Sequence, residues 1–279
     1  MPVTDMPLGI FSKIFPRDTV GEVFAAVRDS GVRVVQFNMT CAGLGDMPDL
    51  VPAETIADIN AAQTATGVEI AAVSGTYNMA HPDPAVRDAG HRALTAVAHA
   101  ARPIGCDLVT LCTGTRNTGH MWHWDDDNDT SEAWRDMAAS FARAVEVADA
   151  ADVDLAIEPE TGNIINSPQR ARRLIDDIGS PRIKVIVDVA NMVNPGEEAR
   201  LPRAMADTFD LLADRIVLAH AKDRTATGTV VPAGEGIVPW QHLLDDLDRI
   251  GYCGPIVIHG TNEQGAATAI RYLRALGGG

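Results

Sequence analysis

The sequence predicts an α/β protein with a single (β/α)8 barrel, the TIM-barrel architecture, and three observations lead to it. Eight short apolar runs alternate with longer amphipathic stretches along the chain. The runs are rich in Val, Ile and Leu and nearly continuous in apolarity, as in parallel strands buried on both faces. A barrel of about 250 residues commonly forms one domain. No break in composition marks a linker, so residues 1–279 are expected to form one domain.

The predicted strands are the apolar runs. An open doubly wound sheet is the alternative, but a glycine-rich GxGxxG loop after the first strand would favour it, and the first run leads into SKIFPRD instead. The runs are LGIF near 8–11, VRVVQFN at 32–38, EIAAVSG at 69–75, DLVTLCTG at 107–114, DLAIEPE at 154–160, IKVIVDV at 183–189, RIVLAHA at 215–221 and PIVIHG at 255–260.

Helical patterns fill the segments between the strands. In the first, residues 19–31, apolar residues fall on one face, Thr19 and Glu22 have the spacing of a capping box, and Gly31 suits the C-terminal cap. Similar patterns occupy 54–66, 85–101, 131–151, 168–178, 200–213, 240–250 and 264–276.

Charge and composition exclude several classes of protein. With 23 Lys and Arg against 38 Asp and Glu, the formal charge is −15, which repels nucleic acid. No segment has the length and purity of a membrane span, and the N-terminus lacks a basic region followed by a long apolar run. The four cysteines form no CxxC pair. We therefore expect a cytoplasmic protein without a nucleic-acid or membrane partner.

Titratable side chains end four consecutive predicted strands: Glu158, Asp188, His220 and His259. Each one separately has an ordinary interpretation, because a histidine there is often structural and a carboxylate often caps the next helix. The carboxyl ends of barrel strands meet at one rim, however, so the four are expected to lie together. Neighbouring carboxylates in a site of low dielectric repel each other, and a divalent cation removes that cost. The set therefore predicts a metal site.

Several motifs on strands three to eight make the chain resemble the xylose isomerase-like TIM-barrel superfamily, the sugar phosphate isomerase/epimerase family, over roughly residues 8 to 275. The motifs are AIEPETGN at 156–163, VDVANM at 187–192, HAKD at 220–223, GEGIVPW at 234–240, SGTYNMAHPD at 74–83 and TGTRN at 113–117. The resemblance implies one divalent metal ion bound by Glu158, Asp188 and His220. The chain has His259 where the family has a fourth ligand, a glutamate, and Asn191 where many of its epimerases have a histidine.

The resemblance implies a metal-dependent isomerase or epimerase of a sugar, polyol or sugar acid, working by proton transfer through a metal-stabilised enediolate. Glu158, His259 and Lys222 are the expected catalytic residues, His259 also being a candidate metal ligand. Two imidazoles with two carboxylates favour Mn²⁺, Co²⁺, Zn²⁺ or Fe²⁺ over Mg²⁺ or Ca²⁺. The alternatives are an inosose-type dehydratase and a polyol-binding barrel that has lost the metal site.

The expected partner is a small sugar or polyol, and a homo-oligomer is compatible with the superfamily. The loop HMWHWDDDND at 120–129 offers aromatic faces to a sugar, although its aromatics would equally suit a barrel cap or a subunit contact. For several other positions a turn or a surface ion pair is an equal alternative to substrate binding. The predicted substrate contacts are Asn78, His81, Arg116, Trp122, His123, Asn191 and Glu235.

Overall fold

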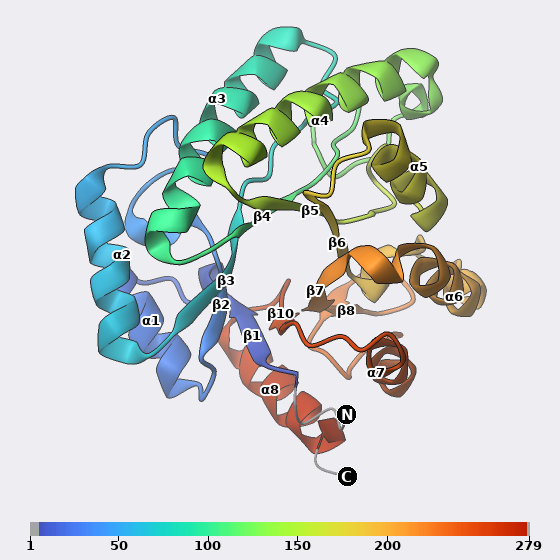
Figure 1. The fold of residues 1–279 in the computed structure, drawn as a ribbon. Helices are drawn as coiled ribbons and strands as arrows, with labels where there is room; N and C mark the ends of the chain where they lie inside the picture. The colour runs from blue at the N-terminus through green and yellow to red at the C-terminus, as the bar shows by residue number, and fades with distance from the viewer. Residues whose placement is uncertain (1–5, 278–279) are drawn as a thin grey trace.

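A computed structural model describes residues 6–277 and confirms the barrel. Eight parallel strands close into a barrel in the order β1-β10-β7-β6-β5-β4-β3-β2 (Figure 1). Each barrel strand therefore pairs with the barrel strands that precede and follow it in the chain, and the last strand, β10, pairs with the first, β1. The strands are β1 (Leu8–Phe11), β2 (Val34–Phe37), β3 (Glu69–Ser74), β4 (Leu108–Leu111), β5 (Asp154–Ile157), β6 (Ile183–Val187), β7 (Ile216–Ala221) and β10 (Ile256–Ile258).

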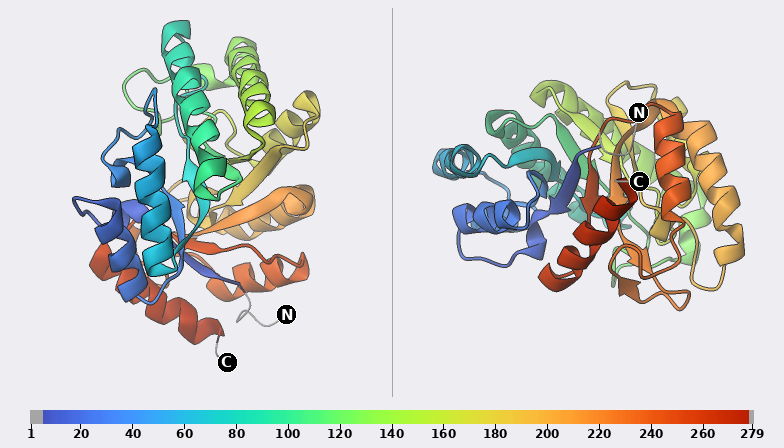
Figure 2. Two further views of the ribbon diagram at one scale, coloured as in Figure 1. Left: turned by 60° about the vertical axis from the view of Figure 1, so that its left-hand side comes forward. Right: turned by 90° about the horizontal axis from the view of Figure 1, so that it is seen from below.

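A helix follows each barrel strand, and the helices form a ring outside the sheet (Figures 1 and 2). Each predicted helical stretch coincides with one of them to within two residues at either end. The helices are α1 (Val20–Asp29), α2 (Ala53–Thr66), α3 (Pro84–Ala101), α4 (Ser131–Ala151), α5 (Pro168–Ile178), α6 (Leu201–Leu212), α7 (Trp240–Arg249) and α8 (Glu263–Gly277).

The helix boundaries follow the local signals in the sequence. Thr19 caps α1 through its side chain, and Glu22 completes the capping box. Gly31, just past the end of this helix, has a φ of 84°, a conformation that favours glycine. At α5, the Ser167 side chain accepts a hydrogen bond from an amide of the first turn, and proline follows it directly.

The core continues from the barrel interior into the layer between strands and helices. Side chains such as Phe37 and Leu155 on strands and Phe141 and Phe209 on helices have at most 1% of their surface exposed. Continuous burial of this kind is the main source of stability in a barrel. Within residues 6–277, no helix is both long enough and apolar enough to span a membrane.

One element was not anticipated from the sequence, a short antiparallel hairpin of β8 (Asp223–Arg224) and β9 (Val230–Val231) after β7. The hairpin and the loop that follows it are held by the buried carboxylate of Asp223. This carboxylate accepts hydrogen bonds from the amides of Arg224, Gly234, Gly236 and Val238 and from the indole N–H of Trp240, at 2.9–3.1 Å. The GEGIVPW motif is therefore folded around one side chain of the HAKD motif.

Candidate metal centre and substrate pocket

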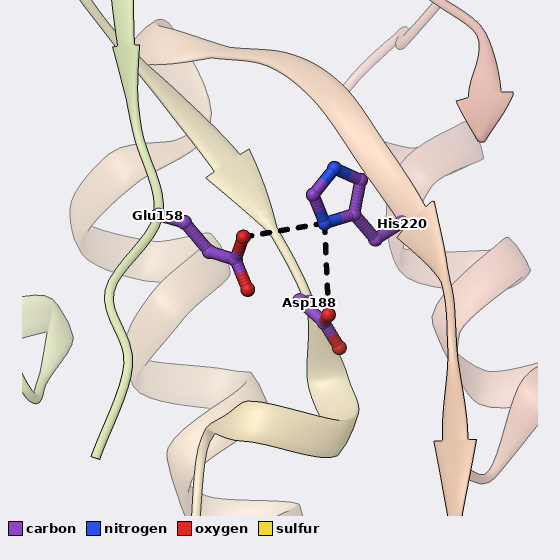
Figure 3. A group of neighbouring side chains, drawn as sticks. All are labelled: Glu158, Asp188 and His220. Atoms are coloured by element: carbon purple, nitrogen blue, oxygen red, sulfur yellow. Dashed lines mark ion pairs between the residues drawn. The ribbon is translucent and has the colours of Figure 1, made fainter. Parts of the chain in front are cut away.

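Glu158, Asp188 and His220 meet at the carboxyl end of the barrel. Glu158 follows β5 directly, Asp188 follows β6, and His220 lies next to last in β7. The Nδ1 atom of His220 lies 3.3 Å from Oε2 of Glu158 and 3.6 Å from Oδ2 of Asp188 (Figure 3). Potential ligand atoms of the three residues lie within 4.8 Å of one another, and in residues 6–277 no other group of three or more His, Cys, Asp or Glu does so.

The imidazole of His220 is oriented for a cation by a residue of β2, a strand separated from β7 by β10 and β1 in the barrel. Its Nε2 lies 2.9 Å from Oε1 of Gln36, a buried residue of β2. This hydrogen bond places a proton on Nε2 and leaves Nδ1 facing the carboxylates. Nδ1 is buried and has no hydrogen-bond partner among the described residues. A buried, unpartnered nitrogen between two carboxylate oxygens fits a divalent metal ion.

A second layer of hydrogen bonds holds the carboxylates. The Nδ2 atom of Asn191 donates to Oε1 of Glu158 at 2.6 Å and lies 3.3 Å from Oδ2 of Asp188. Its Oδ1 accepts a hydrogen bond from the ammonium of Lys222 at 2.8 Å. Asp188 also accepts a hydrogen bond from the backbone amide of Ala190. Asn191 therefore fixes both carboxylates, and Lys222 fixes Asn191.

Burial and charge shift the pKa values of these groups strongly. Burial opposes the charged forms of Glu158 and His220, but their mutual attraction prevails: the pKa of Glu158 falls below its usual range, and that of His220 rises to about 9. Burial raises the pKa of Asp188. Burial together with the charge of Glu158 raises the pKa of Glu160 to about 8. The two carboxylates thus favour a positive charge at Nδ1 of His220. A bound metal ion would supply that charge in place of a proton.

His259 lies beside this cluster and is not one of the three clustered side chains. Its ring stacks on that of His220, with centroids 4.6 Å apart, and on that of Phe11, with centroids 4.5 Å apart. Burial and the charge of His220 lower its pKa to about 3, so the ring is neutral at physiological pH. The stacking holds His259 between the triad and the first strand, where its edge lines the pocket.

A pocket of about 320 Å³ opens above the triad. Its lining includes Glu158 and His220 of the triad, together with His259. Trp122, with 40% of its surface exposed, and Met121 lie on its wall. The remaining lining residues are Phe11, Lys13, Gln36, Asn38, Asp46, Ser74, Thr76, Thr110, Leu111, Cys112 and Ile186. A pocket of this size, with polar lining residues and an aromatic wall, suits a small polyhydroxylated molecule.

The loop that carries Trp122 is fixed to the loop after β5. The side chain of Asn163 accepts a hydrogen bond from the amide of Gly114 and donates one to the carbonyl of Met121. At Gly162 a Cβ atom would lie only 2.2 Å from the carbonyl oxygen of Trp122. Glycine at this position is therefore what lets the aromatic loop lie against the barrel rim.

The other predicted substrate contacts lie outside the pocket lining. Asn78 bridges the loops after β3 and β4 through hydrogen bonds to the backbone of Thr115. Arg116 is buried and pairs with Asp136 at 2.8 Å. His81 accepts a hydrogen bond from the amide of Asp83.

His123 and Glu235 also lie apart from the triad. The ring of His123 stacks on that of His120, with centroids 4.1 Å apart. Glu235 lines a separate depression with Gly260 and Thr261. Of the predicted contacts, Trp122 thus lines the pocket and Asn191 touches the triad.

Two residues near the triad were not among the predicted site residues. Gln36 orients His220, and a polar residue in the middle of the apolar run VRVVQFN is a signal that could have identified it. Glu160 follows Glu158 by two residues, and burial together with the charge of Glu158 raises its pKa to about 8. Its proximity depends on the turn after β5, which the sequence does not specify.

Comparisons with known proteins agree with this geometry. The family model described as "Xylose isomerase-like TIM barrel" matches residues 24–276. L-ribulose-5-phosphate 3-epimerase UlaE of Shigella flexneri serotype 5b is 25% identical over 280 residues, covering 97% of this chain and 92% of that protein.

Solved structures agree in fold. The apo form of 3-keto-D-glucoside 4-epimerase, YcjR, from E. coli superposes with a TM-score of 0.75 at 20% identity, covering 97% of this chain and 99% of that one. A D-tagatose 3-epimerase-like protein gives a TM-score of 0.78 at 17% identity, with 97% of each chain covered.

The fold and the site define an α/β barrel with a candidate metal-binding triad at its carboxyl end. The chain belongs to the xylose isomerase-like TIM-barrel family. Since its curated relatives include sugar epimerases that match 97% of the chain, it is an isomerase/epimerase-like enzyme.

Proposed function

We propose that this protein is a metal-dependent epimerase of a small sugar, with Glu158, Asp188 and His220 as metal ligands. The observation that carries the proposal is the convergence of these three side chains beneath a pocket of sugar size. A divalent ion held there supplies Lewis-acid polarisation of a sugar carbonyl. One nitrogen and two carboxylate oxygens suit Mn²⁺, Co²⁺, Zn²⁺ or Fe²⁺.

The reaction proposed is removal of a proton from the carbon next to the carbonyl and its return on the opposite face. Glu158 is the proposed base, because its carboxylate lines the pocket and its low pKa keeps it ionised. The hydrogen bond from Asn191 to Oε1 of Glu158 holds that carboxylate in place.

His259 is the proposed proton carrier on the second face. It lines the same pocket, and its neutral ring can relay a proton to the substrate, giving up the proton on one nitrogen while the other nitrogen accepts one from solvent water. Its stacking on Phe11 and His220 restricts the ring to one plane. Lys222 is proposed to act through Asn191, to which it donates its hydrogen bond.

The experiment uses L-ribulose, D-tagatose and D-allulose, because solved structures of similar fold include an L-ribulose 3-epimerase, a D-psicose 3-epimerase with D-tagatose and a D-allulose 3-epimerase with D-allulose. The Mn²⁺-loaded protein is incubated with each sugar in D₂O and followed by NMR. We expect the wild-type protein to convert one of these sugars to an epimer that carries one deuterium at the inverted carbon. The Glu158→Gln variant should not catalyse this conversion. A deoxy or unsaturated product would instead indicate a dehydratase. No exchange in any sugar would contradict an epimerase.

A further inference from the structure

Two oppositely charged side chains form an ion pair at the mouth of the pocket. The Nζ atom of Lys13, in the turn after β1, lies 2.7 Å from Oδ1 of Asp46, in the loop after β2. Both residues line the pocket. Among the pocket-lining residues that the structure describes, Lys13 is the one lysine or arginine. The one lysine of the described lining is therefore already paired with a carboxylate.

The arginines in the loops after β1 and β4 are paired with other groups. Arg17 makes two hydrogen bonds to the carboxylate of Glu263, at 2.6 and 3.1 Å. Arg116 is buried against Asp136 and donates to the carbonyl of Ala80. A phosphate group would have to break one of these pairs to obtain the bidentate contact that it favours.

The usual phosphate position of a barrel is also unfavourable here. In α/β barrels phosphate often binds at the loops after strands seven and eight, near a helix N-terminus. At the start of α8 the amide of Gly265 already donates to Oδ1 of Asn262. The carboxylate of Glu235 lines the same depression. An anion would meet a negative charge and an amide that is already bonded.

What remains around the mouth suits an uncharged sugar. Trp122 and Met121 offer apolar faces to C–H groups, and the side chain of Asn38 lies with them in the lining. The formal charge of −15 repels a phosphate dianion at longer range.

We propose that the site takes an unphosphorylated ketose and that the Lys13–Asp46 pair excludes the corresponding phosphate ester. This inference rests on the proposed function and narrows its substrate class. The substrate differs in this respect from the 5-phosphate in the name of the UlaE relative. Asp46 is the specificity residue, because its carboxylate both occupies Lys13 and repels a second anion.

The test compares binding, so that it remains decisive if turnover fails. L-ribulose and L-ribulose 5-phosphate are titrated into the protein by calorimetry at one fixed free Mn²⁺ concentration, and D-tagatose and D-allulose are added as further free ketoses. A free ketose is expected to bind at least about tenfold more tightly than the phosphate ester, a difference of about 1.4 kcal/mol. Equal binding, tighter binding of the ester, or no binding of any free ketose overturns the inference.

The Asp46→Asn variant distinguishes the effect of the Lys13–Asp46 ion pair from the effect of the protein's overall negative charge. This variant frees Lys13 and should raise the affinity for the 5-phosphate about fivefold relative to the affinity for the free ketose, in line with the strength of an exposed pair. Asp49→Asn is the matched control: it removes an exposed carboxylate of the same loop that is not part of the lining, and should alter neither. If Asp49→Asn increases the affinity for the phosphate ester as much as Asp46→Asn does, the Lys13–Asp46 pair has no specific role.

Epimerisation of the same ligands is measured in parallel. Turnover of the 5-phosphate in preference to every free ketose would uphold the proposed function and overturn this inference. Tighter binding of a free ketose without turnover would uphold the inference about the ligand and contradict the proposed function.

Discussion

Gln36 should control metal affinity although it is not a proposed ligand. Its side chain, from a residue with 4% of its surface exposed, lies 2.9 Å from Nε2 of His220. Gln36→Met keeps the length of the side chain but removes the acceptor, so Nε2–H becomes a buried donor without a partner. That loss costs about 1–3 kcal/mol, and second-layer partners of metal ligands typically change affinity about 10–100-fold. We expect the dissociation constant for Mn²⁺ to rise by about that factor.

The assay is calorimetric titration of Mn²⁺ into protein freed of metal by a chelator, at one pH. Gln36→Glu is the control, because it keeps an acceptor oxygen towards Nε2 and should bind Mn²⁺ within a few-fold of the wild type. Thermal unfolding without metal separates a folding defect from a binding defect. The reasoning is refuted if folded Gln36→Met binds Mn²⁺ as tightly as the wild-type protein.

Three further predictions concern the loops and the fold. Gly162→Ala places a methyl group against the carbonyl of Trp122 and should raise KM for the ketose severalfold with little change in Mn²⁺ affinity. The control is Gly119→Ala, where a Cβ atom meets nothing nearer than 3.5 Å. Equal KM values for the two variants would contradict the role of the loop contact. Asp223→Asn puts an amide donor among five donors and should lower the free energy of unfolding in urea by about 3 kcal/mol; a loss below about 1 kcal/mol would be inconsistent with the network. His91 is buried, and burial followed by the charge of Arg143 lowers its pKa from 6.5 to about 4. Because the unfolded chain binds the proton first, stability falls as the pH drops from 6.5 to 4, by about 3 kcal/mol from this group; His91→Gln should flatten that part of the urea-midpoint profile, and an unchanged slope would show that His91 does not cause it.

The barrel was predictable because its signals are local. Each strand is an apolar run, each helix has its caps, and the parallel arrangement follows from their alternation. The same reasoning predicted that Glu158, Asp188 and His220 lie close together, since residues at the carboxyl ends of barrel strands share one rim. Position at a strand end was sufficient for this inference, and no long-range contact had to be guessed.

The details that depend on contacts across the barrel were not predictable. The hydrogen bond from His220 to Gln36 joins residues 184 positions apart. Arg116 was a predicted substrate contact, and its burial against Asp136 depends on how α4 packs. The stacking of His259 on His220 likewise requires the spacing between β7 and β10. Hairpin β8–β9 was missed because its strands have only two residues each.

The most direct test of the central claim is the location of Mn²⁺ by anomalous X-ray diffraction from crystals of the metal-loaded protein. The account predicts one strong peak per chain, within coordination distance of Nδ1 of His220 and of carboxylate oxygens of Glu158 and Asp188. Extension of the coordination to His259 would add a ligand without changing the claim. A peak at another position, or none at this triad in a fully loaded crystal, would contradict it.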